Sequence, residues 1–543
     1  MTETQEYLLE LFKELDAICK KYDIEYYLGG GSLIGAVRHS GFLPWDDDAD
    51  IHMSRENAEK FAWAVKEEGL KNRVVYVKSP NGDYMNSHWR YENTASTLLM
   101  RGLTGSSGAQ GQFIDIFVLY PLPVDEKKKE KCIENFDMFV ELKAQNAVAE
   151  SHRDRKYLKR YFRAKRLEKI IGKKRLINRL EKKMYNFPQE GSKDWFICAP
   201  FPPKRVVPKD WWGKPRYVKF ESIMLPVPEY AERILSYEYG PNWFEVPSYT
   251  ERGEHTFVTD FDIPYEVYTA EYNKYLDINN FYKHQVKKKE YWMRLLKKRN
   301  VINPQIRTLQ GMCTFMEIQR GIDEYGFDLK ELVQQGREQE LKMLFQKYFT
   351  MMKSNSFRYW GIYIDMPDEY LYAALYFNCF DGKYGLARKI LRAREKNRAD
   401  AMSEELKSLY DICNATDELL ENLYGNGDLN IVRQLIDKWL KDYPKLLYFM
   451  RAKMYLDLMD FEQSKYEQLM KQCKEYLAQY HNDGELLKYQ GDLYLKANQI
   501  EKAELCYKKA LCRLKNGFAI ADIKRYFEQS SGGKDETATA KNV

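Results

Sequence analysis

The sequence predicts a mixed α/β domain followed by an all-helical array, on three observations. Apolar residues recur at helical spacing over residues 4–22, and short runs of β-branched and aromatic residues continue as far as Leu119. Beyond about Thr269 the apolar spacing is almost entirely that of helices. The 543 residues are also too many for a single hydrophobic core, so more than one domain is expected.

The elements of the α/β domain succeed one another in a readable order. A helix over 4–22 leads into a strand at 24–28, which ends in three glycines. A short helix, a turn, a strand and a longer helix are expected next, at 32–38, 41–44, 47–53 and 55–68. Further strands are predicted at 73–78, 87–91, 96–100 and 112–119. Together these elements predict a domain that spans residues 1–268.

Two segments of this domain are less regular. Residues from about 125 to 185 are helical in period and very basic, which predicts a helical insertion. The Trp- and Pro-rich stretch from Trp195 to Pro247 has little periodicity. We interpret it as an irregular segment that closes the domain.

The second half divides by composition and repeat pattern. A helical connector is expected over 269–349, a repeat region over 350–528 and a disordered tail over 529–543. The clearest unit runs from Leu486 to Leu511. Its positions match the packing positions of paired helices in a tetratricopeptide repeat: Leu487, Gly491, Tyr494, Ala503, Tyr507 and Ala510. We expect this array to recognise a peptide, a partner protein or an extended glycan, and to carry no chemistry.

Composition and charge narrow the class of protein. With 44% hydrophobic residues and 18 prolines the chain is globular, and collagen-like or wholly disordered classes are excluded. No apolar run approaches the length of a membrane span, and the acidic start does not resemble a secretory signal, so a cytoplasmic location is expected.

The positive charge is concentrated in one segment. Residues 152–183 hold 15 Lys and Arg against 3 Asp and Glu, within a chain whose net charge is +6. Interleaved apolar residues predict an amphipathic face, which favours an anionic surface as partner: lipid headgroups at the inner face of a membrane, or a lipid-diphosphate glycan carrier. Nucleic acid is the less favoured partner, and a merely solvated helical face is the simplest alternative.

Residues 28–53, LGGGSLIGAVRHSGFLPWDDDADIHM, hold the most informative pattern. Three glycines and a serine between a strand and a helix allow backbone amides to approach a phosphate, and the helix N-terminus favours its negative charge. Many strand-to-helix turns use glycine for structural reasons alone. The turn therefore predicts a phosphate cradle only in combination with the acidic residues downstream.

An acidic run comes directly after this glycine-rich segment. In an extended strand Asp46, Asp48 and Asp50 share one face, while Asp47 and Ala49 lie on the other. Carboxylates so close together repel one another unless a hard divalent cation lies among them. The alternative is a solvated acidic turn, which the apolar residues on either side of the run make less favourable.

A single aspartate, Asp115, interrupts the apolar run QFIDIFVL. A carboxylate inside a central strand is costly unless it is paired or bound to metal. Asp115 is therefore predicted to join the acidic run through sheet pairing. The alternative is an aspartate that caps or borders an edge strand.

These motifs resemble one known family. GGGSLIGAVRHSGFLPWDDDADI and FIDIF are similar to the LicD family of the nucleotidyltransferase superfamily, which includes bacterial phosphocholine transferases and fukutin-related ribitol-phosphate transferases. VVPKDWWGKPRYVKFESIMLPVPEYAERILSYEYGPNW is similar to the closing motif of that family. The resemblance covers about residues 5–250 and omits the helical half.

The resemblance implies an activity and a site. The activity is Mg²⁺-dependent transfer of a phosphocholine or phospho-alditol group from a CDP-linked donor to a hydroxyl of a cell-surface glycan or its lipid-linked precursor, with release of CMP; Mn²⁺ is the alternative metal. Donor phosphate would lie against Gly30, Gly31 and Ser32, with Arg90 as a weaker candidate. The metal ligands would be Asp48, Asp50 and Asp115. Asp46 would support the metal or accept a proton, and Arg38 would neutralise the transferring phosphate, although a surface salt bridge explains Arg38 equally well.

Two other functions stay open. The same carboxylates would support nucleotidyl transfer from a nucleoside triphosphate. A non-catalytic interaction protein with a vestigial α/β domain is the third interpretation, which the intact acidic run disfavours because an inactive site has no need of mutually repelling carboxylates.

Overall fold

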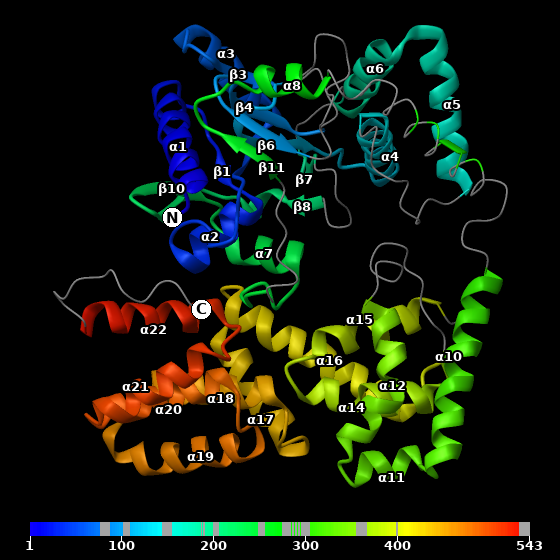
Figure 1. Ribbon diagram of the computed structural model, residues 1–543, viewed down its shortest axis with the longest axis vertical. Coiled ribbons are helices and arrows are strands. Elements are labelled where there is room, and N and C mark those ends of the chain that lie inside the picture. Colours follow the sequence, from blue (N-terminus) through cyan, green and yellow to red (C-terminus); the bar gives the residue numbers. More distant parts are fainter. Residues whose placement is uncertain are drawn as a thin grey trace. The chain divides into compact units, whose positions relative to one another are not determined.

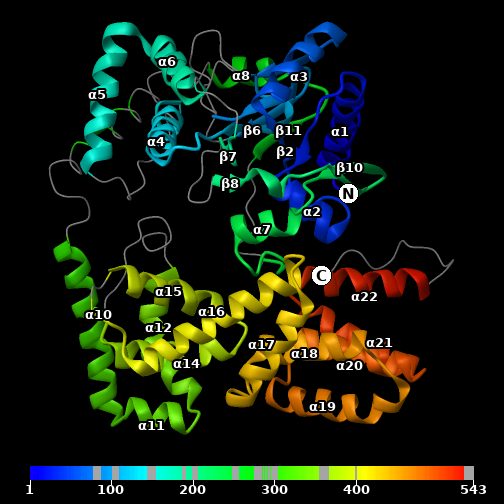
Figure 2. The same cartoon turned by 180° about the vertical axis from the view of Figure 1, so that it is seen from behind.

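The computed structural model describes most of the chain: residues 1–76, 87–100, 109–143, 155–185, 187, 191–198, 206–247, 256–273, 284, 287, 290, 291, 294, 304–353, 366–397 and 400–530 (Figures 1 and 2). It divides into two compact units. Unit 1 comprises Met1–Glu238, Gly253–Ala374 and Ile390–Leu406, and unit 2 comprises Tyr239–Arg252, Leu375–Lys389 and Lys407–Val543. Most of the predicted tail lies outside the described residues, and the domain boundaries expected from the sequence stay a prediction.

Unit 1 is built on a mixed sheet, as the sequence predicts. Its seven strands are β1 (Tyr27–Leu28), β2 (Asp50–Ser54), β3 (Arg73–Tyr76), β4 (Trp89–Asn93), β6 (Gln112–Pro121), β7 (Asp194–Ile197) and β8 (Val206–Pro208). The long strand β6 is central, because it pairs in parallel with β2 and antiparallel with both β4 and β7. Each of these pairings brings a different segment of the chain to β6.

Three helices accompany the first strands: α1 (Glu3–Lys21), α2 (Gly30–His39) and α3 (Arg55–Glu68). Helix α1 begins in a capping box, in which Thr2 and Gln5 satisfy each other's backbone N–H groups. Its apolar stripe is buried, and α1 and α3 pack against each other and against β6. The predicted helices at 4–22 and 55–68 are confirmed.

The predicted helical insertion is also confirmed. It consists of α4 (Glu126–Lys143), α5 (Arg155–Ile171) and α6 (Lys173–Tyr185), which lie together in both views (Figures 1 and 2). Leu158, Tyr161 and Leu176 are buried in one cluster with Met138 and Leu142 of α4. Most apolar residues of α5 and α6 therefore belong to a core that these helices share with α4, whereas Ile170 at the end of α5 is 80% exposed.

The closing segment is more regular than the sequence predicts. After β7 and β8 come a short 3₁₀ turn (Lys209–Trp211), the antiparallel hairpin β9 (Arg216–Phe220) and β10 (Ile223–Val227), and helix α7 (Ala231–Tyr239). Phe220 at the end of β9 packs against Phe12 and Phe42. The expectation of an irregular segment was wrong because two pairs of short strands, rich in Pro and Trp, give no clear alternation.

The remaining elements begin with one more strand pair in unit 1. Strand β5 (Thr97–Met100) pairs antiparallel with β11 (Thr256–Asp260), and α8 (Tyr265–Asn273) comes next. All further named elements are helical: α10 (Pro304–Tyr325), α11 (Leu329–Gln334), α12 (Glu338–Lys353), α14 (Asp368–Phe380), α15 (Tyr384–Asn397), α16 (Glu404–Tyr424), α17 (Leu429–Asp442), α18 (Leu447–Met459), a 3₁₀ turn (Gln463–Lys465), α19 (Tyr466–Gln479), α20 (Gly484–Lys496), α21 (Ile500–Leu511) and α22 (Gly517–Ser530). Among the described helices none is long and apolar enough to cross a bilayer.

The predicted helix pair in the second half is present. Helices α20 and α21 pack closely, and a Cβ atom on Gly491 would lie only 2.5 Å from the Tyr507 ring. Leu487, Ala503 and Ala510 are buried in the same cluster. The small residues at the crossing thus have the packing role expected of a tetratricopeptide-like pair.

Unit 2 also contains a short segment from the middle of the chain, residues 239–247, which we call the strap. Phe244 is 1% exposed and stacks on Tyr424 at 3.8 Å between ring centroids. The Gly517 N–H donates to the Phe244 carbonyl at 2.9 Å, and the Tyr448 hydroxyl donates to Glu245 at 2.6 Å. The strap is therefore a packed part of the helical array, although it comes directly after α7 in sequence.

Candidate active site

The glycine turn joins β1 to α2 and lies directly against the acidic segment. Gly30 has φ of +50°, and a Cβ atom there would collide with the Asp50 carboxylate. A Cβ atom on Gly31 would collide in the same way with Asp46. The glycines are thus required by the close approach of two carboxylates, in addition to any role toward a ligand.

Two hydrogen bonds hold the turn to the first residue of β2. The Gly31 N–H donates to Asp50 Oδ2 at 3.3 Å, and the Asp50 N–H donates to Ser32 Oγ at 3.0 Å. These bonds place the Asp50 carboxylate at the N-terminal end of α2. There the partial positive charge of the helix favours an anion.

The acidic run does not form the continuous strand that the sequence predicts, because β2 begins only at Asp50. In the non-strand segment before it, Asp46, Asp47 and Asp48 can bring one carboxylate oxygen each within 4.8 Å of one another. The expectation that Asp47 faces away was wrong, since strict alternation of side chains requires extended strand geometry. Gln5 of α1 fixes this segment by donating to the carbonyls of Leu43 and Asp46, at 2.9 and 3.1 Å.

Sheet pairing brings Asp115 beside Asp50, as predicted. The two residues are partners in the parallel register of β2 and β6, and the Asp115 N–H donates to the Ala49 carbonyl at 2.8 Å. Side chains of register partners project from the same face of a sheet. Asp50 and Asp115 therefore share one face next to the glycine turn.

The electrostatics of the two carboxylates differ. Burial, together with the negative charges of Asp48, Asp115 and Asp46, raises the pKa of Asp50 well above its ordinary value. Burial also acts to raise the pKa of Asp115, but Arg90 and His88 outweigh it and hold that pKa at about 2. The site thus contains one carboxylate with a balanced charge and one whose ionised form lacks compensation.

Comparisons with known proteins agree with this geometry. Residues 23–121 match the family described as LicD/FKTN/FKRP, nucleotidyltransferase domain. Because of this similarity we refer to residues 23–121 as the LicD-type domain. This match holds the glycine turn, the acidic run and Asp115, which are the motifs that carry the resemblance in the sequence.

Two curated relatives are similar over short segments of the LicD-type domain. The lipopolysaccharide cholinephosphotransferase LicD of Haemophilus influenzae is 48% identical over 61 residues, which are 11% of this chain and 23% of the relative. The ribitol 5-phosphate transferase FKRP of Homo sapiens is 30% identical over 90 residues, 16% of this chain and 18% of the relative. The matched segments thus span less than a quarter of the length of either relative.

Arg90 lies inside the LicD-type domain and contacts Asp115 and Phe113, which the sequence alone does not reveal. Its Nε donates to Asp115 Oδ1 at 2.6 Å, and its guanidinium carbon lies 3.5 Å from the centroid of the Phe113 ring. The side chain is only 2% exposed. Arg90 thus compensates the charge of Asp115, and its predicted contact with donor phosphate stays a prediction.

Arg38 is buried at the end of α2 and lies over the Trp45 ring at 5.9 Å. Burial lowers the pKa of its guanidinium to about 10. The simple alternative of an exposed salt bridge does not describe Arg38, because the side chain is 4% exposed. Its role toward phosphate stays a prediction.

Sequence reasoning missed two buried residues, His88 directly before β4 and Glu92 within it. His88 Nε2 lies 3.3 Å from Asp115 Oδ2, and Glu92 accepts from the Gly111 N–H at 2.6 Å. Burial raises the pKa of Glu92 to about 8. The segment HWRYEN alternates, which places His88, Arg90 and Glu92 on one face, and this alternation is the signal that could have revealed them.

The donor set fits a hard divalent cation. The carboxylates of Asp46 and Asp50 lie against Gly31 and Gly30, and burial together with the neighbouring negative charges raises the pKa of Asp50. Oxygen-only sites of this kind suit Mg²⁺ and Mn²⁺. Asp48, Asp50 and Asp115 stay the predicted ligands with Asp46 as the predicted support, and the geometry adds Asp47 to the candidates.

Proposed function

We propose that the chain transfers a phosphocholine or phospho-alditol group from a CDP-linked donor to a hydroxyl of a cell-surface glycan or of its lipid-linked precursor. The observation that carries the proposal is the buried Asp50 carboxylate, held in register with Asp115 and against a glycine turn. The activities for which the LicD and FKRP relatives are named supply the class of transferred group.

The reaction balances as a single displacement at phosphorus. The acceptor oxygen forms a bond to the phosphorus that carries choline or the alditol. The bond from that phosphorus to the bridging oxygen of the diphosphate breaks, and CMP leaves with the electron pair. The proton of the acceptor hydroxyl passes to a carboxylate of the site, for which Asp46 is the proposed group.

The metal would be held by Asp48, Asp50 and Asp115, and when bound it would offset the negative charge that develops on the leaving oxygen. Around it, the start of α2 at Gly30 and Gly31 would favour a donor phosphate through the partial positive charge of the helix N-terminus. Arg38 would add a fixed positive charge toward the same phosphate. Arg90 keeps Asp115 ionised and oriented through the bond to its Oδ1 atom.

Nucleotidyl transfer from a nucleoside triphosphate is the second candidate, because the same carboxylates would support it. The test is to incubate the full chain and Mg²⁺ with either CDP-choline or CTP, with a glycan acceptor present, and to identify the products. Our proposal expects CMP from CDP-choline or a CDP-alditol. Pyrophosphate released from CTP, with no CMP from any CDP-linked donor, would favour the second candidate.

We further propose that the basic insertion α5–α6 serves the approach of an anionic acceptor and that the helical array binds a protein partner. The described basic residues of α5 and α6 and the packed helix pair α20–α21 support these roles. A location at the inner face of a membrane would be expected if the acceptor is lipid-linked.

A further inference from the structure

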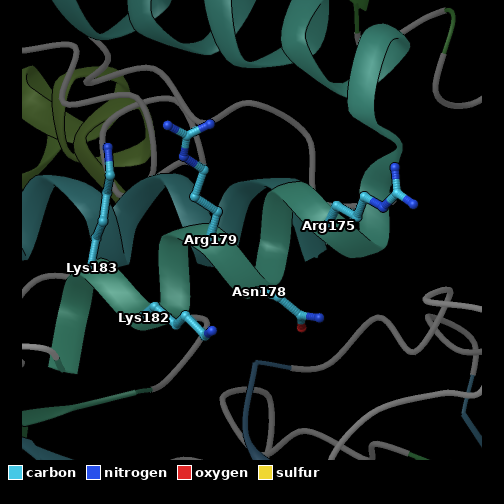
Figure 3. A pocket seen from close by; sticks show the side chains of 5 residues that line it. All are labelled: Arg175, Asn178, Arg179, Lys182 and Lys183. Carbon is cyan, nitrogen blue, oxygen red and sulfur yellow. The ribbon is translucent and has the colours of Figure 1, made fainter.

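One face of α6 carries a group of side chains that donate hydrogen bonds, which we call the α6 stripe. Its members line a hollow of about 540 Å³ and all project from this single helix: Arg175, Asn178, Arg179, Lys182 and Lys183 (Figure 3). Their spacing of three and four residues keeps them on one side of the helix. The hollow is separate from the carboxylate site of the LicD-type domain in its residues and in its charge.

The opposite side of α6 is anchored in the protein. Leu176 and Ile177 are 3% and 7% exposed, and Met184 is fully buried. Leu176 belongs to the cluster that α6 shares with α4 and α5. The α6 stripe is therefore held on a fixed helix, and no apolar face of α6 is left over to insert into a bilayer.

In the part of the chain that the structure describes, the positive charge of the stripe has no ion-pair partner. Within the described ranges, no carboxylate forms an ion pair with Arg175, Arg179, Lys182 or Lys183, whereas the acidic residues of α5 and α6 are already paired. Glu181 binds Arg55 at 2.6 Å, and Glu168 binds Lys165 at 2.7 Å. The hollow thus offers its charge to an external anion.

The arrangement of the donors indicates the kind of anion. Figure 3 shows Arg179 and Lys183, one turn apart, extending to the same side of α6, and Lys182 and Asn178 extending to the other. Guanidinium and ammonium groups bind phosphate oxygens through charge-assisted hydrogen bonds. The four cationic residues of the hollow, Arg175, Arg179, Lys182 and Lys183, match the charge of a diphosphate better than that of a single phosphate.

We propose that the α6 stripe binds a diphosphate group. The diphosphate can belong to a lipid-linked glycan carrier or to a soluble compound, and the choice of a lipid-linked acceptor rests on the proposed function. The buried apolar side of α6 argues for a discrete phosphate ligand over general adsorption to a membrane. The basic insertion would then bind phosphate through residues that are separate from the carboxylate site.

The test measures direct binding to the full chain at about 150 mM NaCl, where weak surface attraction is screened. Inorganic pyrophosphate and farnesyl diphosphate in neutral detergent are titrated calorimetrically, without donor and without divalent metal. The variant is R179Q/K183Q. The control is R163Q/R166Q, which removes the same charge from positions of α5 outside the hollow.

We expect pyrophosphate to bind the wild-type chain and R163Q/R166Q alike, and R179Q/K183Q to bind at least tenfold more weakly. Tighter binding of farnesyl diphosphate than of pyrophosphate would identify the lipid-linked source, and equal binding the soluble one. Equal losses in both variants would overturn the site in favour of diffuse charge. The site would also be overturned if the wild-type chain bound anionic phospholipid vesicles but neither diphosphate. Because no transfer is measured, failure of the transferase proposal would leave this result unaffected.

Discussion

At the residue scale, the site depends on the absence of two side chains. Gly30 and Gly31 face Asp50 and Asp46 so closely that no Cβ atom fits. The glycine-rich turn therefore packs directly against the acidic run and fixes the positions of the Asp46 and Asp50 carboxylates.

Gly31→Ala should lower the transfer rate by about 100-fold, because the new methyl group displaces Asp46 by about an ångström. The fold should persist, since Asp46 is only half-buried and can move away. The measurement is kcat/KM together with the melting temperature. Gly385→Ala is the matched control, because nothing lies within 4 Å of its Cβ position. Equal activity of the two variants would contradict the close packing of turn and carboxylates.

Glu92 should make the stability of the LicD-type domain depend on pH. Its pKa is about 8 in the folded chain and near 4.5 in the unfolded chain, so the folded state holds the proton through this range. The free energy of unfolding should therefore fall as pH rises from about 4.5 to 8, by on the order of 2–4 kcal/mol from this group. Glu92→Gln should remove that fall, while Glu3→Gln on the surface should not. Urea unfolding of the three proteins at pH 5 and at about pH 8 measures the difference.

At the element scale, periodic segments were predictable and irregular pairings were not. Helices α1 and α3 have a clear apolar stripe, and β6 is an unbroken apolar run around Asp115, so pattern alone predicts them. The start of β2 was misplaced because the acidic run mimics alternation. The bond between Arg90 and Asp115 needs the register of β4 against β6, which a single sequence does not contain.

The hairpin β9–β10 also acts on the site through the segment that precedes the acidic run. Glu221, at φ of +53° in the hairpin turn, accepts from the Phe42 N–H at 3.0 Å and donates its own N–H to the Ser40 carbonyl at 2.8 Å. Through Phe42 and Phe220 the hairpin packs on α1 as well. The hairpin, whose sequence resembles the closing motif of the LicD family, thus supports the segment before the acidic run.

Glu221→Asn should slow transfer about tenfold, the equivalent of one lost hydrogen bond of about 1.4 kcal/mol. Asparagine tolerates positive φ, so the hairpin turn keeps its shape while the shorter side chain no longer reaches Phe42. Turnover and melting temperature are compared with those of Lys219→Gln, an exposed change in the same hairpin. A Glu221→Asn enzyme as fast as this control would show that the contact does not position the site.

At the scale of the whole molecule, the strap joins a segment from the middle of the chain to the helices of unit 2. The sequence pattern favours a stretch from residue 1 to about 270 that folds without the helices. The strap lies within that stretch, yet Trp243 and Phe244 are buried among residues of α16 and α22. Sequence analysis missed this because Glu245 of the strap and its partner Asn516 are 271 positions apart.

Phe244→Ala in the full chain should destabilise unit 2 by about 3–5 kcal/mol, because it leaves a cavity beside Tyr424. Leu505→Ala, at a 54% exposed position of α21, is the control and should change stability by less than about 0.5 kcal/mol. Thermal and urea unfolding monitored by circular dichroism measure the effect. Indistinguishable stabilities of the two variants would show that the strap does not contribute to the helical array.

The most direct test of the central claim is the transfer rate of Asp50→Asn at saturating Mg²⁺, with CDP-choline as donor and CMP release as the signal. The carboxylate is buried among like charges, so its loss should abolish turnover and leave the melting temperature unchanged or higher. Asp48→Asn should behave in the same way. Near wild-type turnover of folded Asp50→Asn would contradict the assignment of these carboxylates to metal and catalysis.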